Sequence, residues 1–372
     1  MTDENCQHSP LEPVHEELGA TFTDFAGWRM PVRYSSELDE HRAVRSTAGI
    51  FDLSHMGEIR IRGPQAGAAL DHALSGRFSV LPSGRARYTL LLNRDGGIID
   101  DLVVYHLPGG DFLAVVNAAN TAVDLAELTA RAQGFDAEVI DESAQTALIA
   151  VQGPDAAAVV TATLTAADLG ADEISSLGYY RWGSGTFEGE PIGVARTGYT
   201  GEDGFELYIP ASSAARLWRA LRLTSAVRLT PCGLACRDTL RLEAGMPLYG
   251  HELTASTKPS QAGLGRVVSF AAADDFVGRA ALEGRDGSAD PVLVGLAGEG
   301  RRAARAGYRV LDASGVPVGQ ITSGALSPTL GHPVAMAYLQ PGSAEPGTRL
   351  GVDVRGTTLP FTVVTLPFYA RS

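Results

Sequence analysis

The stretch YTLLLNRDGGIIDDLVVYH, residues 88–106, decides how the surrounding chain folds. Two apolar runs flank an Asp-Gly-Gly sequence at residues 95–97. An Asp-Gly pair between apolar runs is the strongest short signal of a β-hairpin, because the tight turn needs positive φ angles that glycine adopts without strain. We therefore expect paired strands at residues 88–92 and 98–105.

The second strand of this hairpin contains two adjacent carboxylates, Asp100 and Asp101. Because side chains alternate between the faces of a strand, these acids must point in opposite directions and cannot both serve one site. Aspartate is depleted in strand interiors, and a buried carboxylate without partners is costly. Both faces are otherwise apolar, so we expect at least one acid at the wall of a cavity. The residues alone leave open the alternative, a solvated acid near the turn.

Composition bounds the fold class. The chain has 372 residues, of which 45% are hydrophobic and 20% charged, which suits a globular protein of about two or three domains. It contains 43 glycines and 20 prolines, and short apolar segments with turn signals recur along it. These features predict an α+β protein with antiparallel or mixed sheets.

The formal net charge of −13 argues against binding to nucleic acid, because affinity for duplexes comes largely from basic contacts to phosphate. A small anionic ligand is compatible with this charge, since one or two local arginines suffice for it. The single lysine, Lys258, is followed by Pro259. A phosphate-binding P-loop is therefore excluded, and a pyridoxal phosphate enzyme, which would also need this lysine, is disfavoured.

The three cysteines, Cys6, Cys232 and Cys236, are sparse and odd in number, which excludes a disulfide scaffold and favours a reducing compartment. Cys232 and Cys236 lie four residues apart on one face of an expected helix, but they lack the further ligands that zinc needs. We expect no metal site.

The first 28 residues contain no arginine or lysine, so neither a secretory signal nor a transit peptide is expected. No apolar run approaches ~18 residues, which argues against a membrane span. These observations predict a cytoplasmic location.

Residues 50–140 are expected to form one compact α+β unit around the hairpin. Its other expected elements are a strand at 51–62 that contains Ser54, His55 and Met56, a helix at 65–74, a strand at 112–116 and a helix near 121–133. A second unit begins near residue 148. In its expected strand at 205–209, Glu206 shares a face with Tyr208, toward either solvent or a cleft.

A later helix is marked at both ends, with Thr230 as a suitable N-cap, Pro231 at the first helical position and Gly245 just past the end. Arg237 lies near its middle and pairs within the helix, extends into solvent, or presents a fixed guanidinium to a ligand. Residues 254–290 are a polar connection. After it, short β segments with turn signals recur, which predicts a small β-barrel or jelly roll.

Six motifs, in the order in which they occur along the chain, resemble those of the glycine cleavage system T-protein family. The members of this family are tetrahydrofolate-dependent aminomethyltransferases. The motifs are FAGWRMPVRY (25–34), FDLSHMG (51–57), NRDGGIIDDL (93–102), RTGYTGEDGFE (196–206), ACRDTLRLEAGMPLYGHEL (235–253) and ITSGALSPTLG (321–331). The resemblance extends from about residue 11 to residue 369. Each motif is moderately specific, and together they are highly specific.

The resemblance implies a three-domain cloverleaf around a central folate cavity. Domain 1 would be discontinuous and bind folate, with residues 1–49 and 142–253. Domain 2, residues 50–141, would be an insert that carries the aspartate hairpin. A connection at 254–290 would lead to a C-terminal β-barrel domain at 291–372.

The family's activity gives the implied reaction and partner. The lipoylated H-protein presents an aminomethyl group on a dihydrolipoyl sulfur, so the lipoyl group comes with the partner. The enzyme releases ammonia and passes the methylene carbon to tetrahydrofolate, its acceptor substrate, which yields 5,10-methylenetetrahydrofolate. No covalently bound cofactor is implied.

The family also implies the site residues. Asp101 matches the second acid of the GG-x-x-D-D motif and would be catalytic, stabilising the positive charge that develops on the transferred carbon. Its ordinary pKa of ~3.9 favours electrostatics and positioning over proton transfer unless burial raises that pKa. The residues that would bind folate are Met56, Asn117, Tyr199, Glu206 and Arg237, with Tyr369 in the closing PFY as a looser match.

The chain departs from the family pattern at residues 259–266, where Gln261 and Arg266 replace the family's glutamate and tryptophan. This departure bears on the packing of the connection and on H-protein docking more than on folate binding. A further hypothesis concerns the partner: the arginines clustered near the N-terminus of this acidic chain would form a basic patch for it. They are Arg29, Arg33, Arg42 and Arg45.

Two related functions are the alternatives. One is a folate-dependent demethylase module of the sarcosine or dimethylglycine oxidase kind, which usually has a flavin domain in the same chain. The other is a non-catalytic folate-binding protein that assists iron–sulfur assembly. Those proteins have a Lys-Gly-Cys-Tyr-type motif where this chain has TGYTGEDG at residues 197–204, and they would not need Asp101.

Overall fold

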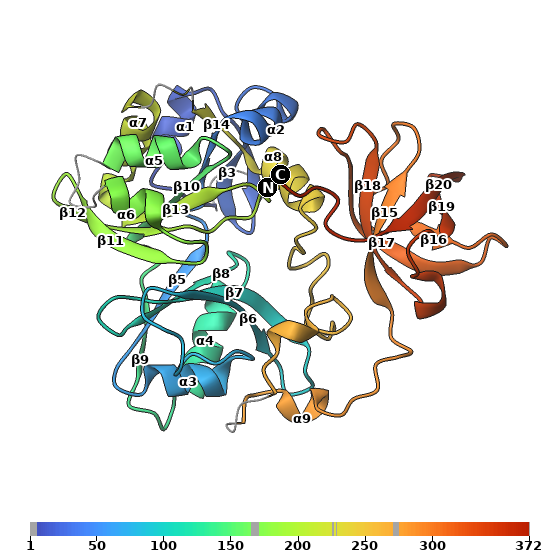
Figure 1. Ribbon diagram of the computed structural model, residues 1–372, viewed down its shortest axis with the longest axis horizontal. Helices are drawn as coiled ribbons and strands as arrows, with labels where there is room; N and C mark the ends of the chain where they lie inside the picture. The colour runs from blue at the N-terminus through green and yellow to red at the C-terminus, as the bar shows by residue number, and fades with distance from the viewer. Residues whose placement is uncertain (1–5, 165–170, 225–226, 228, 271–274, 372) are drawn as a thin grey trace.

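The computed structural model describes residues 6–164, 171–224, 227, 229–270 and 275–371. These residues form two sheet-and-helix bodies and a barrel, arranged around a centre as Figure 1 shows. The predicted α+β class with three bodies is confirmed. The last body closes as a barrel and is not a jelly roll.

The first body is built on a six-stranded sheet with the order β11-β12-β13-β10-β4-β14. Its strands are β4 (Gly49–Asp52), β10 (Thr146–Gln152), β11 (Trp182–Phe187), β12 (Glu190–Ala195), β13 (Gly204–Pro210) and β14 (Thr230–Pro231). The helices of this body are α1 (Glu12–Glu17), α5 (Ala156–Leu164), α6 (Ala171–Ser176) and α7 (Ala214–Thr224), with the turn η2 (Ala211–Ser213) before α7. They cover one face of the sheet, where Trp218 of α7 is fully buried.

Strand β10 lies inside this sheet and is buried along almost its whole length. A strand that reads as a continuous apolar run is covered on both faces. The helices cover one face of β10, and the second body covers the other, so the apolar sequence of this strand fixes where the two bodies meet.

A small N-terminal sheet has the order β1-β3-β2, and helix α2 (Glu37–Ser46) follows it. Its strands are β1 (Gln7–His8), β2 (Thr21–Phe25) and β3 (Trp28–Arg33). Ser36 caps α2, because its hydroxyl accepts a hydrogen bond from the Asp39 N–H at 3.1 Å. This segment packs beside the first body, next to the start of a later helix, α8 (Leu234–Glu243).

The second body contains the predicted hairpin and has the strand order β6-β7-β8-β5-β9. Its strands are β5 (Gly57–Arg62), β6 (Ala86–Leu92), β7 (Ile98–His106), β8 (Phe112–Val116) and β9 (Glu138–Asp141), and its helices are α3 (Ala66–Ala73) and α4 (Thr121–Arg131). Strands β6 and β7 pair antiparallel with Leu90 opposite Asp101, and Gly96 in the turn has φ +77°. The hairpin prediction is confirmed.

The single strand expected at residues 51–62 is wrong. The chain leaves β4 after Asp52, turns, and enters β5 at Gly57. Strand β4 pairs with β10 of the first sheet, whereas β5 pairs with β8 of the second, so the turn carries the chain between two bodies. Met56 N–H donates to the Leu53 carbonyl at 2.9 Å within this turn. Period-two alternation cannot reveal such a change of sheet.

The start expected for the helix near residue 230 is also wrong. Thr230 and Pro231 form β14, which pairs parallel with β4, and α8 begins after Gly233. A Cβ on Gly233 would lie 2.3 Å from the Val32 carbonyl oxygen, so only glycine fits there. Cys232 therefore precedes the helix instead of sharing a face of it with Cys236. Gly245 follows the last turn with φ +67°, as expected.

A connection leads from α8 past the second body to the barrel (Figure 1). It contains the turn η3 (Gly265–Val267) and the short helix α9 (Arg279–Leu282). The barrel closes in the order β15-β18-β17-β16-β19-β20. Its strands are β15 (Val292–Gly298), β16 (Arg309–Leu311), β17 (Pro317–Leu326), β18 (Pro333–Leu339), β19 (Arg349–Val354) and β20 (Thr357–Val364), with the turn η4 (Pro341–Ser343) after β18. Within the described ranges, no helix is long and apolar enough to cross a bilayer.

The division into domains at residues 1–49 with 142–253, 50–141, 254–290 and 291–372 stays a proposal. The pairing of β4 with β10 favours moving the boundary between residues 49 and 50 a few residues later, to follow Asp52.

Replacing Gly97 by alanine is expected to destabilise the second body by about 2–4 kcal/mol, because the new Cβ would lie 1.9 Å from the Ala255 carbonyl oxygen. The midpoint of thermal unfolding should fall by several degrees. Gly342→Ala is the matched control, since a Cβ there meets nothing within 4 Å. Equal unfolding midpoints for the two variants would contradict this contact.

Candidate functional site

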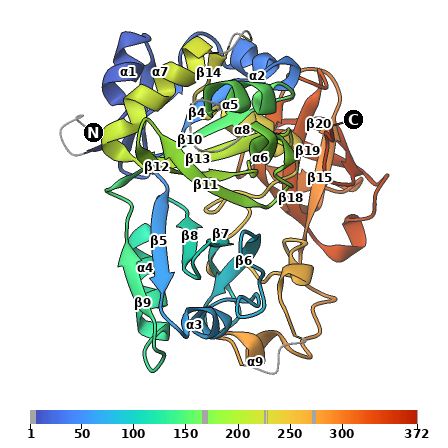
Figure 2. The same ribbon diagram turned by 60° about the vertical axis from the view of Figure 1, so that its left-hand side comes forward.

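A cavity of about 390 Å³ lies where the two sheet-and-helix bodies face each other, a volume typical of small-molecule sites. Figure 2 shows the first sheet above β5 to β8 of the second. The cavity is lined by residues of both bodies and of α8, and by the segment after α8. Asp101 lines it, together with Met56, Asn117, Tyr199, Glu206 and Arg237.

Strand β7 presents the Asp101 carboxylate to the cavity, and two neighbours hold it. The Tyr88 hydroxyl donates to Oδ2 at 2.9 Å, and the Asn117 side-chain amide donates to Oδ1 at 3.1 Å. Burial and then the negative charge of Asp100 raise the pKa of Asp101 to about 7, although both hydrogen bonds oppose the increase. The expectation of an acid at a cavity wall is confirmed. The pKa removes the earlier objection to proton transfer.

Asp100 points to the opposite face of β7, as the strand pattern predicted, and is fully buried beneath α4. Its Oδ1 accepts hydrogen bonds from the side-chain amides of Asn117 at 2.8 Å and Asn120 at 2.7 Å. The same Asn117 amide also contacts Asp101, so one side chain links the two acids. Asp100 is not among the described residues that line the cavity, so the two acids do not share one site, as predicted, and Asp100 acts on Asp101 only from behind the strand.

Asp124 of α4 completes a group of three acids behind the cavity. Burial, and the charge and contact of Asp100, raise the pKa of Asp124 to about 10. No other described donor reaches either of its buried oxygens. Asp124 is therefore protonated at neutral pH and can donate its proton to Asp100, which keeps one acid of the group uncharged.

Glu206 of β13 reaches the cavity from the other sheet. Its Oε2 accepts hydrogen bonds from the Thr197 hydroxyl at 2.5 Å and the Tyr105 hydroxyl at 3.2 Å. Among the described residues no donor reaches Oε1. One oxygen is thus fixed by the protein, and the other is left for a ligand.

Arg237 of α8 lies with its guanidinium 4.8 Å from the centre of the Tyr199 ring. Its neighbour Arg241, and not Arg237, makes the intrahelical pair with Asp238, at 2.8 Å. Burial lowers the pKa of Arg237, and no carboxylate of the described chain forms an ion pair with it. Of the interpretations left open for Arg237, an intrahelical pair, a solvated tip or a guanidinium held for a ligand, the structure favours the last. Tyr199 is fixed in turn, because its hydroxyl donates to the Pro247 carbonyl at 2.5 Å.

His55 also lines the cavity, next to Met56 in the turn between the two sheets. Burial lowers the pKa of His55 to about 4, so the imidazole is neutral at physiological pH. Its ring packs edge-on against Phe25 with 5.3 Å between centroids, and no described group bonds to its buried Nδ1.

Tyr369 is not brought together with the other predicted residues. Its ring lies against the Arg45 guanidinium, 4.0 Å from ring centre to Cζ, outside the cavity lining. Its N–H donates to the Glu243 carbonyl at 2.8 Å, which fixes the C-terminal segment against α8.

The four N-terminal arginines do not form one free basic patch. The Arg45 side chain is 9% exposed and forms ion pairs with Glu202 and Glu243. Arg29 pairs with Glu12 and Glu16, while Arg33 and Arg42 are exposed. The hypothesis relied on proximity in the sequence, but Arg29 and Arg33 lie on β3 while Arg42 and Arg45 lie on α2, so their side chains have different surroundings.

Sequence reasoning missed several lining residues: His55, Tyr88, Tyr105, Tyr180 and Thr197. A signal for Tyr105 was present, because it shares the Asp101 face of β7. The register of the hairpin gave a signal for Tyr88. This residue lies opposite Val103, which is two residues from Asp101 and on the same face of β7. Thr197 lies in a loop, where no periodicity exists to predict its direction.

In the part of the chain that the structure describes, no three side chains of the metal-binding types gather closely enough to hold an ion.

Comparison with known proteins accounts for nearly the whole chain. Residues 11–272 match the family model described as the GCVT N-terminal domain, and residues 292–370 match the glycine cleavage T-protein C-terminal barrel domain. The chain is 64% identical to an aminomethyltransferase from Cutibacterium acnes over 98% of this chain and 99% of that protein. It is 55% identical to an aminomethyltransferase from Streptomyces coelicolor over the full length of both.

A solved structure agrees with these relatives. The crystal structure of the glycine cleavage system aminomethyltransferase T from Bartonella henselae superposes with a TM-score of 0.90. The two chains are 38% identical, and the match covers 98% of each.

Replacing Asp100 by asparagine is expected to lower the pKa of Asp101 by about one pH unit or more, because it removes a like charge behind the strand. Carbon-13 NMR of labelled aspartate carboxyls, followed from pH 4 to pH 9, measures this pKa directly. Asp111→Asn, directly before β8 and outside the cavity lining, is the control. A pKa near 7 in both variants would show that burial alone sets it.

Proposed function

The chain belongs to the glycine cleavage T-protein family and is an aminomethyltransferase, and from this premise we propose which of its residues bind the substrates and perform the transfer. Proteins of this family use tetrahydrofolate as a substrate. One observation carries the proposal: Asp101 from one sheet, and Glu206 and Arg237 from the other body, meet at a single cavity.

Tetrahydrofolate is proposed to bind with its pterin ring at Glu206 and Arg237. A pterin presents an amino group and a ring N–H side by side, and a carboxylate can accept both hydrogen bonds. The unpartnered Oε1 of Glu206 supports this assignment, as does the absence of an ion pair to Arg237 in the described residues. The walls between these residues and Asp101 include the aromatic rings of Tyr88, Tyr105 and Tyr199, which suit a flat ring.

Asp101 is proposed to act on the carbon being transferred. When the carbon–sulfur bond of the aminomethyl group breaks, the carbon gains positive charge, and an ionised carboxylate beside it lowers the barrier. The raised pKa of Asp101 makes the free enzyme a mixture of both protonation states near pH 7. The positive charge that develops on the transferred carbon would favour the ionised state, so the reacting donor itself would keep the carboxylate charged.

Protons must also move, because two amine protons of the folate are lost while the sulfur and the ammonia each gain one. A carboxyl group that titrates near neutral pH is suited to pass a proton between these atoms. We therefore assign Asp101 electrostatic stabilisation first and proton transfer second. Tyr88 and Asn117 orient it for both roles.

The donor is proposed to be the lipoylated H-protein, whose flexible arm would bring the aminomethyl group to the cavity. None of the three cysteines is among the described residues that line the cavity, and Cys232 and Cys236 are buried, so a lipoyl sulfur brought by the partner is the thiol that we assign to the donor. A cytoplasmic location stays a prediction.

Asp101→Asn is expected to slow methylenetetrahydrofolate formation by about 10²-fold or more, with folate affinity changed only a few-fold, because the carboxylate acts mainly in the transition state. The rate is measured with aminomethylated H-protein and tetrahydrofolate. Asp95→Asn, in the exposed turn of the same hairpin, should keep full activity. Full turnover by the Asp101 variant would remove this residue from the mechanism.

Glu206→Ala is expected to weaken tetrahydrofolate binding by about 2–3 kcal/mol, since a charged acceptor and two ordered hydroxyls lose their partner. Titration calorimetry measures the affinity. Glu138→Ala changes a carboxylate on the exposed edge strand β9 and should leave it unaltered. An unchanged dissociation constant for the Glu206 variant would place the pterin elsewhere.

A further inference from the structure

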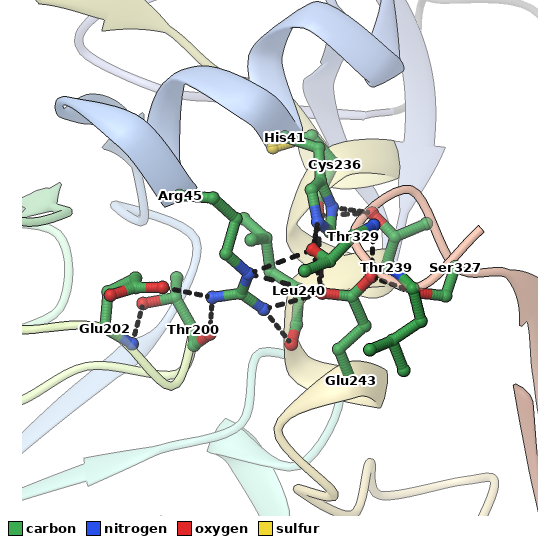
Figure 3. Close-up of polar contacts among 11 residues, drawn as sticks. His41, Arg45, Thr200, Glu202, Cys236, Thr239, Leu240, Glu243, Ser327 and Thr329 are labelled. Atoms are coloured by element: carbon green, nitrogen blue, oxygen red, sulfur yellow. Dashed lines mark hydrogen bonds and ion pairs between the residues drawn. The ribbon is translucent and has the colours of Figure 1, made fainter. Parts of the chain in front are cut away.

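We infer that Arg45 is a positioning residue for tetrahydrofolate, because it ties the loop at residues 197–203, part of which lines the cavity, to the C-terminal barrel. The inference rests on the proposed binding of folate in that cavity. Figure 3 shows the contacts that carry it, which we call the Arg45–Glu243 clasp. The clasp comprises Arg45 and His41 of α2, Glu243 of α8, and Ser327 and Thr329 of the turn between β17 and β18.

Glu243 is the centre of the clasp, and its side chain is 1% exposed. Its Oε1 accepts hydrogen bonds from the Ser327 hydroxyl at 2.5 Å and the Thr329 N–H at 3.0 Å. Its Oε2 accepts from Arg45 Nη2 at 2.9 Å and from His41 Nε2 at 3.1 Å. Burial opposes the charge, yet the contact with His41 and the hydrogen bonds from Ser327 and Thr329 lower the pKa of Glu243 to about 2, so the carboxylate stays ionised.

Arg45 extends the clasp toward the cavity. Its Nη1 donates to the Thr200 carbonyl at 2.7 Å and to Glu202 Oε1 at 2.9 Å. One guanidinium thus holds the barrel through Glu243 and the loop through Thr200 and Glu202. A planar group with five donors can satisfy both sides at once, which an ammonium cannot.

The loop transmits this position to the proposed folate site. The Thr200 hydroxyl donates to Gln152 Oε1 at 2.8 Å, and Gln152 Nε2 donates to the Thr197 carbonyl at 3.0 Å. The Thr197 hydroxyl in turn donates to Glu206. Tyr199, which lies between Thr197 and Thr200 in the sequence, stacks its ring beneath the Arg237 guanidinium. A displacement of Thr200 would therefore move both groups assigned to the pterin.

The barrel contributes no lining residue in the described chain, since the residues that line the cavity lie between Phe25 and Leu264. The clasp is one route by which the barrel can affect folate binding. Other contacts keep the barrel attached without Arg45. Arg241 Nη2 donates to the Ser323 hydroxyl at 2.7 Å, and the Tyr338 hydroxyl donates to the Glu252 carbonyl at 2.8 Å.

Arg45→Lys and Thr329→Val test the inference from the two ends of the clasp. The lysine keeps the charge beside Glu243 but cannot reach the loop as well, and the valine removes a hydroxyl that donates to Glu243 at 2.7 Å. We expect Arg45→Lys to raise the KM and the Kd for tetrahydrofolate about tenfold, with kcat within about twofold. Thr329→Val, an exposed residue remote from the cavity, should change both in the same direction by about threefold.

The measurements are steady-state kinetics and calorimetry well below the unfolding midpoint. Arg62→Lys, in the exposed pair with Glu138, is the control that should alter none of these values. A lowered unfolding midpoint with unchanged folate Kd in both variants would show a purely structural clasp and overturn the inference. If Arg45→Lys does not fold, an unchanged Kd in Thr329→Val alone overturns it. If Glu206→Ala also leaves the tetrahydrofolate Kd unchanged, the proposed folate site itself is wrong. A lower affinity in Glu206→Ala with unchanged affinity in the clasp variants would instead overturn only the role of Arg45.

Discussion

A carboxylate removed from water must be paired, hydrogen-bonded or protonated, and this constraint governs the centre of the protein. Each solution is present within a short distance of the cavity. Glu243 is paired and hydrogen-bonded, Glu206 is held by two hydroxyls, and Asp124 is protonated. Asp101 is the exception, because its hydrogen bonds do not offset burial and the charge behind it. An acid left incompletely stabilised in the free enzyme gains most when a cation arrives.

The arrangement of the sheets explains how such an acid is maintained. Strand β7 buries one face against α4 and presents the other to the cavity. Of its two adjacent acids, Asp100 is therefore buried under the helix and Asp101 faces the cavity. Asp100 then acts through the strand on Asp101, and Asn117 keeps their separation fixed with bonds to both. Neither effect needs contact between Asp100 and a substrate. The pKa of an acid that faces the cavity is therefore adjusted from the opposite face of its strand.

The sequence predicted those parts of the fold that local chemistry determines. The Asp-Gly turn predicted the hairpin, and the recurring turn signals predicted the barrel. Both signals are local, because the conformation of a turn depends on a few neighbouring residues. It did not predict the break after Asp52 or the late start of α8 at Gly233, because both result from contacts with distant strands. For the site, the matched motifs led to Asp101 and Glu206, which line the cavity. The loose match at the C-terminus misplaced Tyr369, and the clustering of arginines misplaced Arg45, because the surroundings of both depend on how the C-terminal segment and the barrel pack.

Arg45 illustrates why charge alone is a poor guide to a docking surface. An arginine in an acidic chain attracts an interpretation as a partner contact, yet the same acidity supplies carboxylates that can take it into the interior. Here Glu202 and Glu243 do so, each from a different part of the chain. Burying a guanidinium is costly unless its donors are satisfied, and such a group tolerates little movement once they are. The segments that it joins, the loop at residues 197–203 and helix α8, are therefore held in one relative position, and both contribute residues to the cavity lining.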